Sequence, residues 1–373
     1  MKIQSWKLGF IVNPIAGMGG RVGLKGTDGE EILRRAMGLG AEPVAPARAR
    51  EALEAFGEVK DSIQLITSPH EMGEDEARKC GFNPTVVGSI TSGRTTAMDT
   101  KKAVEEMMNL KVNLILFVGG DGTARDIYEA ALGNVPVLGV PAGVKIHSAA
   151  FAVAPQAAAR IAIGFLWGRL PLKEVEVMDV DEEAFREGLI SARLYGYVLA
   201  PYEPSLIQGS KMASPTTEDE VRNQAAIAIY IHEMMRLDTI YVLGPGTTTR
   251  TIVDLLDGRK TLLGVDLLFN KKVIAEDLNE EQILEALEGK KSRIIVTPIG
   301  GQGFVFGRGN QQISPAVIRK VGVENIMVIA TRNKLRGLKT LRVDTGDPDL
   351  DDVLRGRIRV VVDYGEERLV RVE

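Results

Sequence analysis

The stretch NLILFVGGDGT, residues 113–123, decides the fold of this 373-residue chain. Its first six residues are strongly apolar without polar alternation, which is typical of a central parallel strand that helices cover on both faces. Glycines follow at once, and helical spacing resumes at Asp126. A strand that runs into a glycine turn and then a helix predicts a doubly wound α/β sheet, with ligands at the carboxyl ends of its strands.

The same rhythm recurs on both sides of this stretch. We expect residues 1–150 to form one α/β domain with a doubly wound parallel sheet. Its further strands are predicted at residues 7–13, 62–67, 84–87 and 135–140. Its helices are predicted at residues 30–39, 47–56, 71–80, 97–110 and 126–132.

The pattern changes near residue 174, and we assign residues 151–373 to a second domain. This domain is expected to be β-rich at 174–200 and 338–373, with a further α/β segment at 239–335. Residues 201–223 are rich in Pro, Ser, Thr and acidic side chains, so we expect a surface loop there.

Composition excludes several classes of protein. Apolar residues make up 45% of the chain and charged residues 26%, which disfavours both a disordered and a membrane protein. The net charge of −4 argues against a nucleic-acid binder that works through a basic surface. One cysteine allows no internal disulfide, and three scattered histidines do not suit a zinc site. The apolar run near the start is too short for a signal peptide, so we expect a cytoplasmic protein with no membrane partner.

Four turns rich in glycine or threonine each follow a predicted strand, at residues 13–20, 119–123, 244–249 and 300–303. Glycine lets the backbone approach a phosphate closely, and the N–H groups that open the next helix favour an anion. A single such turn is weak evidence, because most strand-to-helix corners need glycine for steric reasons. Their recurrence predicts phosphate binding.

The turn at 119–123 differs because it places one carboxylate, Asp121, among small residues at the end of the most buried strand. Asp121 is our candidate catalytic residue: it could orient and deprotonate an acceptor hydroxyl, or hold Mg²⁺ on the phosphates. The alternative is an aspartate that only closes a turn through backbone bonds.

Residues at these corners are candidates for binding nucleotide or phosphate oxygens. Threonines among them could instead be simple helix caps. Lys145 and Arg94 could neutralise developing charge, whereas we expect His147 to be structural and Arg125 and Asp126 to pair or face solvent. The predicted nucleotide- and phosphate-binding residues are Asn13, Pro14, Gly17, Gly19, Gly20, Ser92, Thr95, Thr96, Gly119, Gly120, Gly122, Thr123, Gly143, Lys145, Gly246, Thr247, Thr248 and Gly301.

The pentapeptide Gly-Gly-Asp-Gly-Thr at 119–123 matches the signature shared by NAD kinases, diacylglycerol kinases and phosphofructokinases, and residues 13–17 look like the first phosphate-loop motif of that superfamily. With residues 88–100 and the corner at 139–143, the region 7–150 is most similar to the archaeal and bacterial ATP-NAD kinase-like branch, which includes acetoin-catabolism accessory proteins. The resemblance implies that Asp121 activates the acceptor hydroxyl.

The resemblance further implies a kinase that uses ATP or polyphosphate with Mg²⁺ to phosphorylate NAD to NADP, and a homo-oligomer, either dimer or tetramer. Two departures leave alternatives open. First, NAD kinases usually carry an Asn-acidic pair in the second domain, and residues 191–197 lack such a pair. Second, the second domain of NAD kinases is mostly β, whereas residues 239–335 of this chain have the pattern of alternating strands and helices. The acceptor could therefore be another hydroxylated metabolite. A non-catalytic nucleotide sensor, with the loop 201–223 recruiting a partner, is a further alternative. The turn at 244–249 also resembles the phosphate-binding corner of sugar-phosphate isomerase folds.

Overall fold

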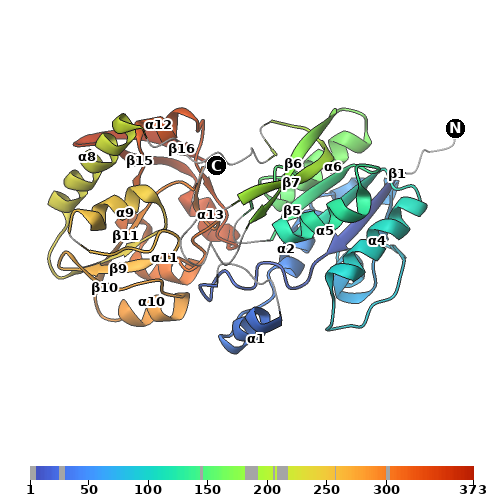
Figure 1. Ribbon diagram of the computed structural model, residues 1–373, viewed down its shortest axis with the longest axis horizontal. Coiled ribbons are helices and arrows are strands. Elements are labelled where there is room, and N and C mark those ends of the chain that lie inside the picture. The colour runs from blue at the N-terminus through green and yellow to red at the C-terminus, as the bar shows by residue number, and fades with distance from the viewer. Residues whose placement is uncertain are drawn as a thin grey trace. The chain divides into compact units, whose positions relative to one another are not determined.

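The computed structural model describes residues 6–24, 30–142, 146–180, 192–204, 206–207, 217–256, 258–299 and 303–373 (Figure 1). Contacts divide the chain into two compact units. The first unit is Met1–Met18 with Gly26–Ser210, and the second is Gly19–Lys25 with Lys211–Glu373. Each unit has its own sheet and its own hydrophobic core, as the separate core clusters show.

The first unit is built on a five-stranded sheet in which every pairing is parallel, with strand order β3-β2-β1-β4-β5. Its strands are β1 (Trp6–Val12), β2 (Ile63–Thr67), β3 (Thr85–Val86), β4 (Leu114–Gly119) and β5 (Val137–Pro141). A separate antiparallel pair is formed by β6 (Leu172–Val180) and β7 (Ala192–Pro201).

Helices cover both faces of this sheet because its central strands are apolar at every position. In β4, Leu114, Leu116 and Val118 pack on one side, while Ile115 and Phe117 pack on the other. Helices α2 (Ala45–Glu54) and α6 (Pro155–Leu166) cover the first side, and α4 (Ala97–Asn109) and α5 (Asp121–Ala131) cover the second. The remaining helices of the unit are α1 (Glu30–Gly38), α3 (Glu74–Lys79) and the short 3₁₀ helices η1 (Gly57–Ser62) and η2 (His70–Met72). The predicted doubly wound sheet is confirmed.

Two helices and one strand pair of the first unit differ from the sequence prediction. Helix α5 begins at Asp121 instead of Asp126, so the glycine turn is itself the first turn of the helix. Helix α6 was not predicted, although Pro155 at its start is a favourable first helical residue. The pair β6–β7 belongs by contacts to the first unit, whereas the sequence interpretation assigned residues 174–200 to the second domain.

The second unit contains a mixed seven-stranded sheet with order β10-β9-β8-β11-β13-β15-β16. The strands are β8 (Thr239–Leu243), β9 (Asp266–Phe269), β10 (Lys272–Ala275), β11 (Lys291–Val296), β13 (Ile326–Ile329), β15 (Gly356–Asp363) and β16 (Glu366–Val372). The neighbours β8, β11, β13 and β15 run parallel, and the outer strands run antiparallel. A small parallel pair joins β12 (Phe304–Phe306) and β14 (Arg342–Val343).

Helices again cover both faces. α8 (Glu218–Met234) and α9 (Thr247–Asp254) pack on one face, and α10 (Glu280–Ala286) and α11 (Pro315–Val321) pack on the other. The shorter helices are η4 (Val323–Asn325), α12 (Arg332–Arg336) and α13 (Pro348–Leu354). The predicted surface loop 201–223 was wrong at its end, because residues 218–223 form the first turns of α8, which Thr217 caps by accepting a bond from Glu220 N. Among the described residues, no helix combines the length and apolar character needed to cross a membrane.

Candidate active site and a cavity in the second unit

The carboxyl ends of β1, β4 and β5 lie side by side in the first unit, because the three strands are parallel neighbours. The chain leaves β1 at Asn13, β4 at Gly120 and β5 at Ala142. Backbone bonds join the three ends: Asn13 N donates to Val118 O at 2.9 Å and Ala142 N to Gly119 O at 3.0 Å. This edge is where a doubly wound sheet places its ligands.

Asn13 links the first glycine turn to the second. Its Nδ2 donates to Thr123 Oγ1 at 2.9 Å, while its Oδ1 accepts a bond from Ile15 N at 3.3 Å. The two side chains that the sequence singled out in separate turns therefore form one hydrogen-bonded pair.

Two glycines at this edge are sterically required. Gly17 has φ +82°, and a Cβ there would lie 1.9 Å from Ala142 O. A Cβ on Gly119 would lie 2.4 Å from Thr123 Oγ1. Only glycine accommodates both approaches, so the compactness of this corner depends on the two positions.

Asp121 is the first residue of α5, and its side chain accepts three hydrogen-bond contacts from the segment that follows β5. His147 N donates to Oδ2 at 2.8 Å, Ser148 N donates to Oδ1 at 2.9 Å, and His147 Nδ1 lies 3.3 Å from Oδ2. Ser148 is itself fixed, because its Oγ accepts a bond from Met178 N on β6 at 2.9 Å. The carboxylate is mostly buried and firmly positioned at the carboxyl edge.

These contacts limit what Asp121 can do chemically. A carboxylate offers about four acceptor positions. Among the described residues, two are filled by the backbone N–H groups of His147 and Ser148, and a third is filled when His147 Nδ1 carries the proton. One remains for an acceptor hydroxyl or for a cation, and both roles fit a side chain at this edge. The N-cap residue of α5 is Gly120, so among the described residues the first N–H groups of the helix receive no side-chain cap and favour an anion.

The described residues contain no group of three His, Cys, Asp or Glu side chains that could enclose a metal ion. A single carboxylate suits Mg²⁺ only where phosphate oxygens supply most of the remaining ligands, which is how magnesium is commonly held in phosphoryl-transfer sites. Asp121 therefore fits Mg²⁺ as one ligand beside a nucleotide.

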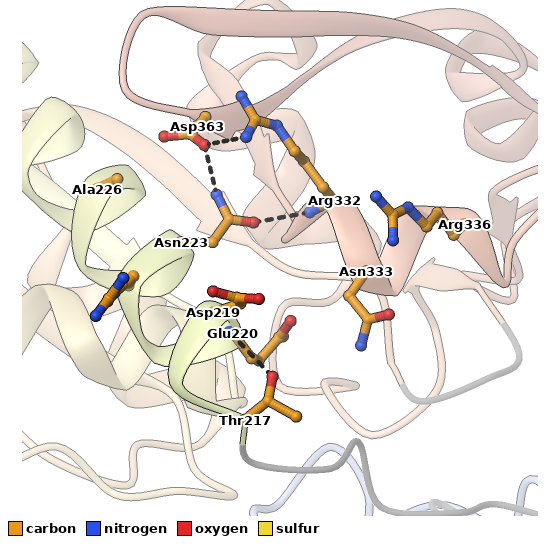
Figure 2. Close-up of a pocket in the computed structure, with 10 residues that line it drawn as sticks. Thr217, Asp219, Glu220, Asn223, Ala226, Arg332, Asn333, Arg336 and Asp363 are labelled. Carbon is orange, nitrogen blue, oxygen red and sulfur yellow. Dashed lines mark hydrogen bonds and ion pairs between the residues drawn. The ribbon is translucent and has the colours of Figure 1, made fainter.

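The second unit holds a cavity of about 620 Å³. Its walls come from the N-terminal turns of α8, from α12 and from the end of β15. Figure 2 shows Arg332 turned toward Asp363 and Asn223, whereas Asp219, Asn333 and Arg336 are joined to none of the other residues drawn. Asn223 Nδ2 also donates to Asp363 Oδ2 at 3.0 Å. The lining residues are Thr217, Asp219, Glu220, Arg222, Asn223, Ala226, Arg332, Asn333, Arg336 and Asp363.

Comparison with known families agrees with this architecture. Residues 8–169 match the ATP-NAD kinase N-terminal domain, and residues 238–372 match the ATP-NAD kinase C-terminal domain. The chain belongs to the ATP-NAD kinase family. It is accordingly an ATP-dependent kinase that acts on NAD, as the resemblance of residues 119–123 predicted.

Other comparisons add nothing on function. No curated protein matches the chain. Among solved structures, a protein described as a UDP-N-acetylglucosamine 2-epimerase from Listeria monocytogenes shares 13% identity, with 91% of this chain and 74% of that chain covered and a TM-score of 0.24. A second UDP-N-acetylglucosamine 2-epimerase shares 11% identity, with 94% of this chain and 86% of that chain covered and a TM-score of 0.26.

Several predicted site residues form hydrogen bonds with residues other than those at the Asp121 corner. Ser92 Oγ donates to Glu71 at 3.0 Å, and Thr96 forms a capping box with Asp99 at the start of α4. Thr95 precedes that cap. This segment follows the edge strand β3, which β2 separates from β1 in the sheet. For Thr96 the capping alternative describes what the side chain does.

Other predicted residues belong to the second unit or fall outside the described residues. Gly19 and Gly20 group with the second unit, where the backbone of the neighbouring Arg21 accepts a bond from Glu280 N at 3.2 Å. Gly246, Thr247 and Thr248 also lie there, at the start of α9. Gly143, Lys145 and Gly301 lie outside the described residues. Pro14 and Gly122 stay at the first unit's edge, in the turn after β1 and the first turn of α5.

Sequence reasoning missed the partners of Asp121. The donors His147 and Ser148 lie 26 and 27 residues downstream, after the next strand, and no local pattern connects them with the pentapeptide. The only available signal was that both turns follow neighbouring strands of one parallel sheet.

Proposed function

We propose that this kinase transfers the γ-phosphoryl group of ATP to a ribose hydroxyl of NAD, forming NADP, at the carboxyl edge of the first unit's sheet. The observation that carries the proposal is the placement of Asp121, a firmly held carboxylate with one acceptor position left, beside the open N-terminus of α5.

Asp121 receives the acceptor hydroxyl. The hydroxyl donates to the remaining carboxylate position, its oxygen attacks the γ-phosphorus, and the new O–P bond forms as the bond to ADP breaks. The proton passes to Asp121, and ADP leaves. The backbone donors from His147 and Ser148 keep the carboxylate aimed, which supplies the positioning on which phosphoryl transfer depends.

The uncapped amides at the start of α5, around Gly120 and Gly122, and the turn that begins at Asn13 bind phosphate oxygens in this proposal. Asn13 and Thr123 hold the two turns together through their hydrogen bond. Mg²⁺, when bound, neutralises the phosphate charge and is held mainly by the phosphates themselves. Homo-oligomer formation, as dimer or tetramer, stays a prediction.

Product analysis tests the proposal. Purified kinase is incubated with NAD, ATP and Mg²⁺, and NADP is measured with an NADP-specific dehydrogenase, alongside ADP release. We expect NADP and ADP in equal amounts. Nucleotide binding without any turnover would identify a sensor instead.

A panel of hydroxylated acceptors is run in parallel, since the chain lacks the Asn-acidic pair usual in NAD kinases. ADP release that depends on a polyol, a sugar or another alcohol, and not on NAD, would overturn the assignment of the acceptor. Replacing ATP by polyphosphate in the same assay identifies the donor.

A further inference from the structure

One lysine of the second unit is partly buried and forms no ion pair with a carboxylate among the described residues. Lys334 lies on α12, and its Nζ donates to Thr297 Oγ1 at 3.2 Å, which is its one hydrogen bond among the described residues. Its ammonium group is buried, and that burial lowers the pKa of Lys334 to about 8. The negative charge of Glu220 on α8 raises the pKa of Lys334, which opposes part of the effect of burial. Glu220 Oε1 accepts a hydrogen bond from Thr331 Oγ1 at 2.7 Å.

A second lysine of the same unit, Lys260, is also buried, and burial lowers its pKa too. Lys260 lies 3.5 Å from Asp266 and donates to the carbonyls of Thr261 and Gly264 at 2.9 and 3.3 Å. A buried ammonium costs free energy unless charge and hydrogen bonds compensate it. Lys260 has both forms of compensation, whereas Lys334 has, among the described residues, one hydroxyl and the more distant attraction of Glu220. An anion beside Lys334 would supply the charge compensation that Asp266 gives to Lys260.

Lys334 reaches the point of the sheet where a ligand is expected. Thr297 follows β11 directly, and Gly246 lies between the parallel neighbour β8 and α9. From β8 the chain passes to β9 on one side, and from β11 it passes to β13 on the other. Their carboxyl ends therefore flank a topological switch point, the usual position of a ligand in an open α/β sheet.

The backbone of Gly246 passes close to Thr297, the hydrogen-bond partner of Lys334. Gly246 has φ +131°, and a Cβ there would lie 2.6 Å from Thr297 Cγ2. The N-cap residue of α9 is Gly246, which has no side chain to cap the helix, so among the described residues the N–H groups of Thr247 and Thr248 receive no side-chain cap. Uncapped amides and a buried ammonium together favour a phosphate.

The cavity of Figure 2 is related to Lys334 through Glu220 and through Asn333, the residue before Lys334 in the chain. Glu220, the charged neighbour of Lys334, lines it, and so does Asn333. From the same turn of α8, Gln224 donates to Thr247 Oγ1 at 3.4 Å. The cavity carries both Arg336 and the carboxylate of Asp219, so its lining suits a ligand with an anionic group and several hydroxyls.

We propose that the second unit binds a small phosphorylated polyol or sugar, with its phosphate between the start of α9 and the ammonium of Lys334 and its hydroxyls in the cavity against Asp219. This site lies within the second unit and does not depend on the NAD-phosphorylating role proposed for the first.

The test follows Lys334 directly in the full-length protein. Lysine side chains are labelled with ¹³C, and the Lys334 signal, assigned by its absence in Lys334→Met, is titrated with pH. Inorganic phosphate and ribose 5-phosphate are the two probes. We expect either probe to shift the Lys334 titration midpoint upward, because a neighbouring anion favours the charged ammonium. A midpoint that stays in place at saturating probe would overturn the proposal, even if phosphate bound in the first unit.

Thermal denaturation with the same probes supplies the second readout. Ribose 5-phosphate should raise the Tm of the parent and of Lys290→Met, a surface control in the same unit, and leave the Tm of Lys334→Met unchanged. The Asp219→Asn variant should bind ribose 5-phosphate several-fold more weakly than the parent does, and it should bind inorganic phosphate with the affinity of the parent. An equal Tm shift in Lys334→Met, or equal loss of both probes in Asp219→Asn, would contradict the assignment.

Discussion

Asp121 has a structural role that also suits the chemistry proposed for it. Its carboxylate accepts backbone bonds from residues 147 and 148, which lie 26 and 27 positions downstream, so these bonds join two segments of the chain and do not close the local turn. That arrangement keeps the side chain mostly buried and fixed in direction. A positioned carboxylate with one open acceptor position is what an alcohol phosphotransferase needs, so the structural role supports the proposed chemical one.

Lys334→Met should stabilise the protein. Lys334→Met removes a buried charge that the Thr297 hydroxyl and the nearby Glu220 compensate incompletely. This recovers the cost reflected in the lowered pKa, less the lost Thr297 hydrogen bond, so we expect the free energy of unfolding at neutral pH to rise by about 1 to 3 kcal/mol. Urea denaturation of both proteins measures this.

The difference in the free energy of unfolding between Lys334→Met and the parent should depend on pH. Between about 8 and the ordinary value of 10.5, the unfolded parent binds more protons at Lys334 than the folded parent, so the parent gains stability as pH rises. The advantage of Lys334→Met should therefore be full below pH 8 and shrink above it. A variant less stable than the parent at neutral pH would show that the ammonium is already compensated.

At the scale of elements, the corner that joins β1 to β5 depends on Gly17. Gly17→Ala should lower the free energy of unfolding by more than about 2 kcal/mol, because the new methyl group meets Ala142 O in a left-handed backbone position. Gly40→Ala is the matched control, since Gly40 has φ +76° and no atom within 4 Å of a Cβ, and it should cost about 1 kcal/mol. Equal losses in the two variants, measured by urea denaturation, would remove the steric argument.

The elements also show what could be predicted from sequence. Apolar runs such as β4 and the glycine corners behind them are local signals, and they located the parallel sheet of the first unit. The start of helix α8 was not predicted, because the composition of residues 201–223 suggested a loop. Thr217 followed by three acidic residues is nevertheless a typical helix start. The environment of Lys334 has no local signal at all, since Thr297 and Glu220 lie 37 and more than 100 residues away.

At the scale of the whole molecule, the division into two units predicts that a ligand slows hydrogen exchange mainly in the unit that binds it. Each has its own core, so binding should protect amides within the unit that binds. With NAD and an ATP analogue, hydrogen exchange should slow at residues 13–18, 119–124 and 146–148. Protection confined to the second unit would place the nucleotide elsewhere than the corner that contains Asp121.

The most direct measurement compares phosphoryl transfer to NAD by the parent, Asp121→Asn and Asp126→Asn, with NAD affinity determined by calorimetry for each. Asp126, on the same helix, lies 4.0 Å from Arg125 and is the matched control. We predict that Asp121→Asn loses about 10²-fold to 10⁴-fold in kcat while still binding NAD, as expected when a general base is removed, and that Asp126→Asn stays near the parent rate. A folded Asp121→Asn protein that phosphorylates NAD as fast as the parent would contradict the assignment.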